Sequence, residues 1–366
     1  MPLLLAELAA YGAPDGIQRL KDALAAHMSR NFGGYKFSPQ HMICAAGCTP
    51  LLDMFAFCTC DDGDGIMLPT PYYPGFAIEV CYKTGAKLLP LHTAAPDFRV
   101  TAAGLRECYD QATKAGTRVR ALLLTNPTNP LGTTMSREEL GAAIDFVREV
   151  GIHLLADEVY AQSVYGTAEG AEEFVSVSTL CKERGEPLGD QLHVMYGFSK
   201  DFCMSGIRAA VLYSENAALH GAMGNIGYFN CISHQTQHTL AGVLEKDGGA
   251  AIDGVLSTLR GDLRDQYTCF SAHLERLGIA YVPSCAGLFT CVNLRQYLEE
   301  DSWEGEVKLQ QRVFDECKAV LTPGADCKMH EPGWFRCCWA SIPQAGYDAF
   351  FARFEATFAA QGGGGG

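Results

Sequence analysis

The sequence contains no apolar run that approaches the roughly 18 residues of a transmembrane helix. Its first residues, Met1 to Glu7, have no positively charged region and are too short for a secretory signal. Positive charge is also scarce, since 28 lysines and arginines face 42 acidic residues and the formal net charge is −14. This balance argues against an acidic partner such as nucleic acid or a membrane surface. We therefore expect a cytoplasmic protein that binds neither.

Two common cofactor and metal motifs are missing as well. No Gly-x-Gly-x-x-Gly follows a predicted strand, which disfavours a dinucleotide-binding oxidoreductase. The sixteen cysteines are scattered and form no Cys-x-x-Cys pair. A zinc site is therefore disfavoured, no metal is expected, and the thiols are predicted to be reduced and mostly buried. The 366 residues, 48% of them hydrophobic and 19% charged, are typical of a globular enzyme with one large or two medium domains.

Short apolar runs alternate with helical patterns, and this alternation predicts an α/β domain with a mostly parallel sheet. The predicted strands of this domain are 41–46, 66–69, 87–91, 118–125, 151–156 and 192–196. A helical stretch over 230–277 then leads to a smaller α+β domain, with strands 279–283, 287–292 and 334–340 and helices 307–320 and 347–358. We expect a large domain over 1–250, a small domain over 251–361 and a disordered glycine tail at 362–366.

The stretch 192–208 contains the residue on which the functional hypothesis depends. An apolar strand from Leu192 ends at Gly197, and a short turn then presents Ser199 and Lys200. Desolvation at the mouth of a strand favours the neutral amine, and a neutral lysine forms a Schiff base with a carbonyl. Taken alone, a surface lysine on a loop is the simpler interpretation.

Other candidate ligand-binding residues also follow predicted strands, which is where open α/β sheets bind ligands. The turn Gly47-Cys48-Thr49-Pro50 precedes an apolar helix, so its N–H groups are placed to hold an anion, and a helix cap by Thr49 is a compatible alternative. Asp157 and Tyr160 follow strand 151–156 and can face one ligand. A buried aspartate there needs a cationic partner, such as a protonated pyridine nitrogen.

Four further side chains have both a functional and a purely structural interpretation. Tyr73, in a proline-framed loop, either covers a flat ring or packs in the core, and Asn129 either donates into a cleft or braces its own turn. Arg336 lies in an apolar strand and needs a partner, for which either a ligand carboxylate or a structural acid would serve. Tyr11 lies on a predicted loop and is either a partner-facing residue or an ordinary loop aromatic.

Together these residues resemble the hallmark positions of the fold-type I pyridoxal-phosphate enzymes of the class I/II aminotransferase family. Within that family the chain is most similar to the 1-aminocyclopropane-1-carboxylate (ACC) synthases. The resemblance extends from Tyr11 to about Phe358 and is carried by the motifs at 69–76, 126–133, 199–201, 286–289 and 331–336. It implies a three-layer α/β/α large domain, a homodimer, an α-amino acid substrate and pyridoxal 5'-phosphate as cofactor.

The resemblance also implies a role for each candidate. Lys200 would hold the cofactor as a Schiff base and shuttle the Cα proton, while Asp157 would keep the pyridine nitrogen protonated. The remaining roles would be hydrogen bonds to the phenolic oxygen from Tyr160 and Asn129, stacking by Tyr73, and binding of the substrate carboxylate by Arg336. The phosphate would be bound by Gly47, Cys48, Thr49, Ser199, Arg208 and Tyr11 of the neighbouring subunit.

Two departures from the family pattern bear on the reaction. Gly197 stands where the family usually has a phosphate-binding serine, and losing one charge-assisted hydrogen bond weakens binding by about 1.5–3 kcal/mol. The family's Gly-x-x-Glu-Asn stretch precedes the tyrosine loop and helps ACC synthases direct S-adenosylmethionine toward ring closure. This sequence begins ten residues before Tyr11, so we expect that segment to be missing. We therefore favour an aminotransferase-type reaction, with ACC synthase or a catalytically weakened homologue as alternatives.

Overall fold

The computed structural model describes residues 10–166 and 173–358, and the predicted glycine tail lies outside them. A seven-stranded sheet runs through the larger part of the structure in the order β1-β7-β6-β5-β4-β2-β3. Its strands are β1 (Met42–Ala45), β2 (Gly65–Pro69), β3 (Lys87–Leu91), β4 (Val119–Thr125), β5 (His153–Asp157), β6 (Leu192–Gly197) and β7 (Ala210–Ser214). Only β7 runs antiparallel to its neighbours, so the prediction of a mostly parallel sheet is confirmed.

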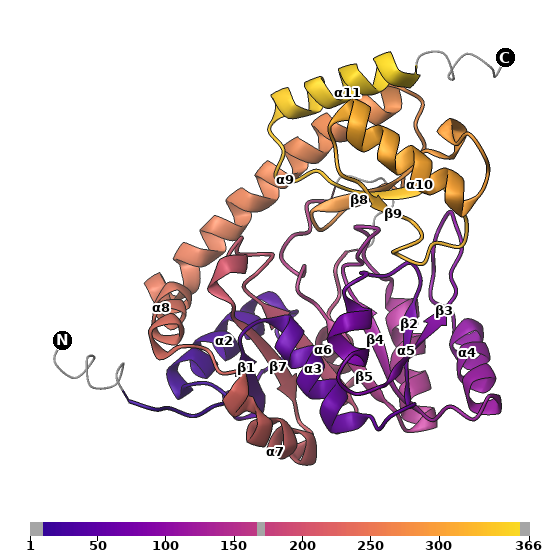
Figure 1. The fold of residues 1–366 in the computed structure, drawn as a ribbon. Helices are drawn as coiled ribbons and strands as arrows, with labels where there is room; N and C mark the ends of the chain where they lie inside the picture. Colours follow the sequence, from indigo (N-terminus) through magenta and orange to yellow (C-terminus); the bar gives the residue numbers. More distant parts are fainter. Residues whose placement is uncertain (1–9, 167–172, 359–366) are drawn as a thin grey trace.

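Helices cover both faces of this sheet and make the predicted three-layer α/β/α arrangement (Figure 1). Successive strand residues alternate between two separate cores, as the pleat of a strand requires. One face packs against α3 (Cys48–Thr59) and α7 (Ala217–Ile226). The other packs against α2 (Gln18–Asn31), α4 (Ala102–Lys114), α5 (Arg137–Val150), α6 (Val177–Arg184) and α8 (His234–Glu245).

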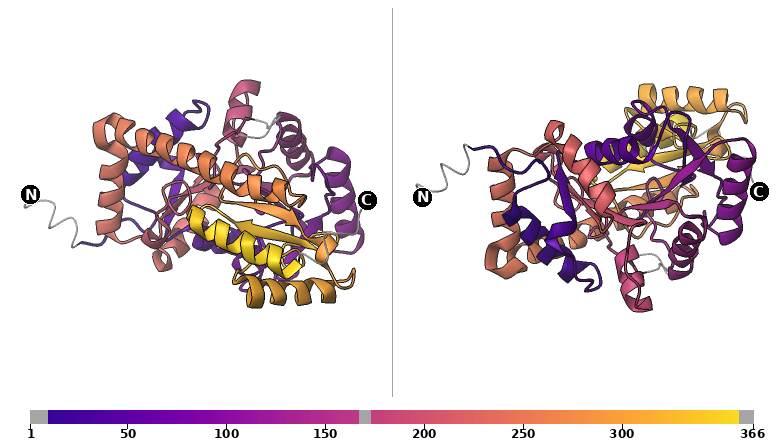
Figure 2. Two further views of the ribbon diagram at one scale, coloured as in Figure 1. Left: turned by 90° about the horizontal axis from the view of Figure 1, so that it is seen from above. Right: turned by 90° about the horizontal axis from the view of Figure 1, so that it is seen from below.

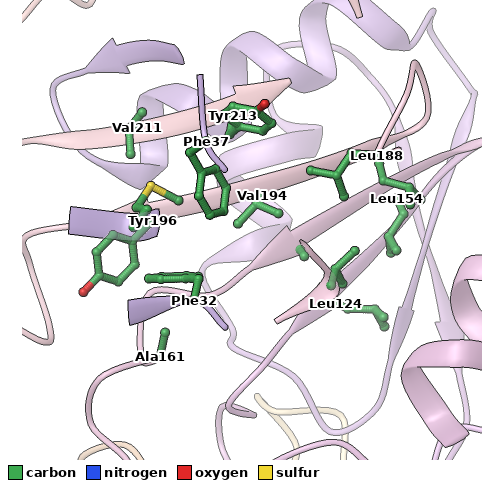
Figure 3. Close-up of a cluster of buried hydrophobic side chains, with 14 of the residues drawn as sticks. Phe32, Phe37, Leu124, Leu154, Ala161, Leu188, Val194, Tyr196, Val211 and Tyr213 are labelled. Carbon is green, nitrogen blue, oxygen red and sulfur yellow. The ribbon is translucent and has the colours of Figure 1, made fainter. Parts of the chain in front are cut away.

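Aromatic side chains tie α2 to the sheet on this second face (Figure 3). The ring of Phe32, just past the end of α2, meets the ring of Tyr196 edge-on at a centroid distance of 4.9 Å. Phe37 meets Tyr213 in the same way at 4.9 Å. Because Tyr196 and Tyr213 belong to β6 and β7, these contacts hold in place the two strands that flank the Lys200 turn.

The smaller part contains a three-stranded antiparallel sheet in the order β8-β10-β9. Its strands are β8 (Phe289–Asn293), β9 (Thr322–Pro323) and β10 (Trp334–Cys338). The long helix α9 (Ala250–Arg276) runs from the large sheet to this part, where α10 (Trp303–Arg312) and α11 (Gln344–Phe358) pack beside it (Figures 1 and 2). Their buried aromatic residues form a core of their own.

Two local predictions for this part were wrong. Residues 279–283 do not form a strand, and Tyr281 makes only an isolated bridge to Val292. The helix predicted over 307–320 begins earlier, at Trp303, and changes at Val313 to a π-helical turn that ends at Cys317. Within 10–166 and 173–358, no helix combines the length and apolar character needed to cross a bilayer.

Candidate active site

A cavity of about 210 Å³ lies at the edge of the large sheet where β4, β5 and β6 end. Parallel strands place their carboxyl ends at the same edge, so residues distant in sequence meet there. Most of the predicted site residues line this cavity: Cys48, Thr49, Tyr73, Asn129, Asp157, Tyr160, Ser199, Lys200 and Arg208. The amine of Lys200 and the carboxyl of Asp157 therefore face one space.

The turn that carries Lys200 is fixed by the residue that follows it. Asp201 is only 1% exposed, and its carboxylate accepts hydrogen bonds from Tyr196 Oη (2.9 Å), the backbone N–H of Gln162 (2.8 Å) and the hydroxyl of Ser163. These donors belong to β6 and to the loop after β5. Asp201 thus joins the Lys200 turn to the loop that carries Tyr160. The amine of Lys200 lies 6.0 Å from the centre of the Tyr160 ring.

Asp157 ends β5 as a buried carboxyl group, 6% exposed. Its side chain accepts one weak hydrogen bond, from the N–H of Val159 at 3.3 Å, and no ion pair with it occurs among the described residues. Burial raises the pKa of Asp157 to about 7, and the charge of Glu79 raises it further while that of Lys200 lowers it. A cation placed beside this carboxyl would restore its ionised form.

The opposite end of the cavity is suited to an anion. Gly47 precedes α3 with φ +112°, and a Cβ built on it would lie 2.3 Å from Nη2 of Arg208. Glycine therefore allows the guanidinium to lie against the first turn of the helix. Arg208 Nη1 is 2.9 Å from the carbonyl oxygen of Ser205 and 3.4 Å from the hydroxyl of Ser199. Guanidinium, hydroxyls and a helix N-terminus together suit a phosphate.

Thr49 does not cap α3, which removes the alternative interpretation of this residue. The helix begins at Cys48, its N-cap is Gly47, and no side chain caps it. Instead, the Thr49 hydroxyl donates to Oε1 of Glu79 at 2.7 Å. Pro50 occupies the third helical position rather than the first, where its missing N–H would also have had no partner within the helix.

Glu79 is a cavity residue that the sequence analysis missed. It lies in the short π-helix η2 (Ala77–Cys81), six residues after Tyr73. Burial raises the pKa of Glu79, while the hydrogen bond from Thr49 and the charges of Lys200 and Arg208 lower it. A single acid within the apolar run Ala77-Ile78-Glu79-Val80-Cys81 was the signal that should have identified it.

Arg336 comes to the site from β10 of the smaller part. Its Nη1 donates to Oδ1 of Asn129 at 3.1 Å, its Nη2 to the hydroxyl of Thr322 at 3.2 Å, and its Nε is buried without a partner. No acidic residue pairs with it among the described residues, so the alternative interpretation of Arg336 as part of a structural salt bridge is not supported. The guanidinium retains its donor capacity for a carboxylate.

The two tyrosines that border the cavity differ in burial. Tyr160 is 3% exposed and packs edge-on against Phe289 at 5.3 Å, and burial raises its pKa well above the ordinary value. Tyr73 is half-buried, packs edge-on against Phe76 at 5.4 Å and lines the cavity. Tyr11 does not line the cavity and is 95% exposed in the single chain.

The cavity residues fit pyridoxal phosphate on two counts. Asp157 is a buried carboxyl with no ion-pair partner in the described part of the chain, which matches a protonated ring nitrogen. Gly47 creates the space in which Arg208 completes an anion cup at the start of α3, which matches a phosphate arm. Lys200 lines the same cavity, and its amine would be available for the aldehyde.

Comparison with known proteins places these features in a family context. Residues 5–354 match the family described as "Aminotransferase class I and II". A 1-aminocyclopropane-1-carboxylate synthase from Malus domestica is 34% identical over 359 residues, covering 96% of this chain and 75% of its own. Synthase 8 from Arabidopsis thaliana is 36% identical, with 92% and 72% covered. A protein from the same plant described as "Probable aminotransferase ACS12" is also 36% identical, with 92% and 67% covered.

Solved structures confirm the fold. An aromatic aminotransferase from Pyrococcus horikoshii superposes with a TM-score of 0.83 at 20% identity, covering 98% of this chain and 90% of that chain. The aspartate aminotransferase of Thermus thermophilus with maleate superposes with a TM-score of 0.82 at 20% identity, covering 97% and 86%. At this level of identity the likeness establishes the three-layer architecture alone.

Proposed function

The chain belongs to the class I and II aminotransferases, a family of pyridoxal-phosphate-dependent enzymes, and we propose that it acts on an α-amino acid at the cavity between Lys200 and Asp157. The observation that supports this proposal best is the joint placement of those two side chains. One is an amine at the end of β6 and the other a buried carboxyl at the end of β5. Both face the space that Tyr73 and Tyr160 enclose.

Pyridoxal phosphate, when bound, supplies an electron sink for the electron pair left on a substrate Cα. Asp157 would hold a proton at the ring nitrogen, because an ion pair there stabilises both buried charges. Arg336 would bind the substrate carboxylate and thereby orient the Cα–H bond toward Lys200. Lys200 Nζ would accept that proton as the general base and later return it. Tyr160 and Asn129 would direct hydrogen bonds to the ring oxygen.

We favour a transamination outcome, in which Lys200 would hold the proton taken from Cα and would not return it to that carbon. The direct test is a keto-acid exchange assay with a panel of amino acids, run on the purified protein together with visible absorbance spectra. Cofactor absorbance that changes on addition of an amino acid, followed by keto-acid formation, is the expected result. Cofactor absorbance without any response to amino acids would instead support the catalytically weakened homologue.

A second candidate function is ACC synthesis from S-adenosylmethionine. It is favoured by the relatives named 1-aminocyclopropane-1-carboxylate synthase, which are 34% and 36% identical to this chain. The first step, removal of the Cα proton, would use the same residues. The outcomes differ in products, so release of methylthioadenosine from S-adenosylmethionine, without keto-acid formation, would identify this reaction.

Family members are typically dimeric, and we propose that Tyr11 reaches the phosphate of the neighbouring subunit. Its 95% exposure in the single chain leaves the ring available for such a contact. Mixing a Tyr11→Phe variant with a Lys200→Ala variant tests this directly. Each homodimer should be impaired, whereas in a mixed dimer of the two variants both changes fall in one active site and the other site stays intact. We further propose a reducing, cytoplasmic setting, since all sixteen cysteines are free thiols.

A further inference from the structure

The hydrogen bond between Thr49 and Glu79 lies at the anion-binding end of the cavity. Thr49 is the second residue of α3, next to the Gly47 turn against which Arg208 lies. Its hydroxyl donates to Oε1 of Glu79 at 2.7 Å, and both residues line the cavity. The Glu79 carboxylate thus accepts the hydroxyl proton of Thr49, which a bound phosphate could otherwise accept.

The number of protons makes the two uses exclusive. A threonine hydroxyl has one proton to donate and two lone pairs that accept. While Glu79 is ionised, the carboxylate can only accept, so the single Thr49 proton is directed toward it. When Glu79 is protonated, its own O–H donates to Thr49 Oγ1, and the threonine proton is free for a phosphate oxygen.

We propose that Glu79 is a proton-linked gate on the phosphate subsite: ionised Glu79 withholds the Thr49 donor, and protonation of Glu79 releases it. Binding of the cofactor phosphate is then coupled to proton uptake by Glu79. The inference rests on the proposed function, because it takes the phosphate of pyridoxal phosphate as the ligand of this end of the cavity. Glu79 would be a positioning residue that acts through Thr49.

The charged and titratable groups that surround Glu79 oppose one another. Lys200 and Arg208, from the segment between β6 and β7, favour its ionised form. Burial raises the pKa of Glu79. A charge on Glu79 also interacts unfavourably with an ionised Asp157 at the end of β5, with the Cys48 thiolate and with the Tyr73 phenolate. A phosphate with close to two negative charges would repel the Glu79 carboxylate and so favour protonation of Glu79.

The test compares cofactor affinity in wild-type protein and in Glu79→Gln. The glutamine amide can donate to Thr49 Oγ1 at every pH, so the threonine proton is available for the phosphate. At pH 8 we expect Glu79→Gln to bind pyridoxal phosphate about three- to tenfold more tightly than wild type, the range of one net hydrogen bond. The difference should shrink as pH falls. Comparing the variant with wild type at each pH cancels the titration of the phosphate itself.

Two matched controls test whether the change in affinity involves the phosphate and the Thr49 hydroxyl. Pyridoxal, which lacks the phosphate, should bind wild type and Glu79→Gln equally. In a Thr49→Val background the gain in pyridoxal phosphate affinity from Glu79→Gln should be smaller than with Thr49 present, because the contested proton is gone and only the direct charge repulsion by Glu79 is relieved. Calorimetry in buffers of different ionisation enthalpy should show more proton uptake by wild type than by Glu79→Gln. Glu79→Ala, which also frees Thr49, should tighten binding in the same direction.

The possible contrary results are distinguishable. Pyridoxal phosphate that binds with equal or lower affinity to both Glu79 variants would overturn the gate and leave the proposed function standing. An equal gain for pyridoxal and pyridoxal phosphate would also overturn it, since the effect would then not involve the phosphate. Absence of any cofactor binding by folded wild-type protein would overturn the proposed function together with the gate.

Discussion

Arg336 and Asn129 are joined by a hydrogen bond of 3.1 Å between Nη1 and Oδ1, although 207 residues separate them in the sequence. Asn129 follows β4 of the large sheet, and Arg336 lies in β10 of the small one. The contact therefore connects the predicted carboxylate-binding side chain to the wall of the cofactor cavity. If Arg336 binds the substrate carboxylate as proposed, the substrate would lie at the boundary between the two sheets.

Replacing Arg336 by lysine is predicted to separate substrate binding from cofactor binding. Lysine keeps the positive charge but loses the planar pair of donors that matches a carboxylate. We expect kcat/KM for the amino acid to fall roughly tenfold to 100-fold, mostly through KM, as expected for the loss of a charge-assisted hydrogen bond. Steady-state kinetics measures this. Cofactor affinity serves as the internal control, and a comparable fall there would contradict the assignment.

Replacing Asp157 by asparagine should change stability and catalysis in opposite directions. Burial gives Asp157 a pKa of about 7 in the folded chain against an ordinary value of 3.8, so the folded state binds more protons between these values. The stability that the folded state gains from binding this proton is fully present below about pH 3.8 and is lost as the pH rises through 7. Without cofactor at pH 8, Asp157→Asn should be more stable than wild type by on the order of 2–4 kcal/mol.

Urea unfolding of the cofactor-free proteins at a series of pH values tests this expectation. The stability difference should approach zero toward pH 4, where both side chains are neutral. Asp110→Asn, on the exposed face of α4, is a matched control that should show no such trend. With cofactor present, kcat of Asp157→Asn should fall by at least tenfold, because no carboxylate holds the ring proton. A fully active variant would contradict the proposed role.

Asp201 is predicted to act on catalysis by positioning Lys200. Asp201→Asn keeps the shape of the side chain but removes its charge and leaves one acceptor oxygen for the donors of Tyr196, Gln162 and Ser163. We expect the Lys200 turn to be held less firmly, and kcat to fall with KM little changed. Steady-state kinetics measures this effect. Ser163→Ala, which removes only one of the three donors, should have a kcat between those of wild type and Asp201→Asn.

Much of the large domain could be predicted because its signals are local. The strand predicted at 192–196 is β6 with one more residue, and the strand predicted at 118–125 is β4 without its first residue. The strand ends also indicated that Asp157, Asn129 and Lys200 would meet, since parallel strands share an edge.

What the sequence did not predict depends on contacts between distant segments. The Thr49 hydroxyl has an equally plausible local role as a helix cap, and only the fold brings Glu79 within 2.7 Å of it. The strand predicted over 279–283 does not form for a similar reason. An apolar pattern alone does not supply a neighbouring strand with which to pair. The three partners of Asp201 come from two further segments, so its positioning role had no sequence signal.

Gly197, which replaces a serine in the family pattern, is sterically matched to Cys48. A Cβ built on Gly197 would lie 3.1 Å from Sγ of Cys48 and 3.1 Å from Cβ of Ala210, which is closer than ordinary van der Waals contact. The thiol therefore takes part of the space that a serine side chain at 197 would need. Restoring the serine alone should fail for steric reasons, whatever its hydroxyl could contribute to the phosphate.

We predict that Gly197→Ser alone destabilises the protein by about 1–3 kcal/mol, the usual effect of overpacking, without a gain in cofactor affinity. Adding Cys48→Ala removes the sulfur and should recover most of that stability. The double variant should then bind pyridoxal phosphate about tenfold more tightly than Cys48→Ala alone, because one hydrogen bond to a charged group has been added. Thermal unfolding and cofactor titration of the four proteins measure both effects. If the serine leaves affinity unchanged in the Cys48→Ala background, residue 197 does not face the phosphate, and the orientation proposed for the cofactor would have to be revised.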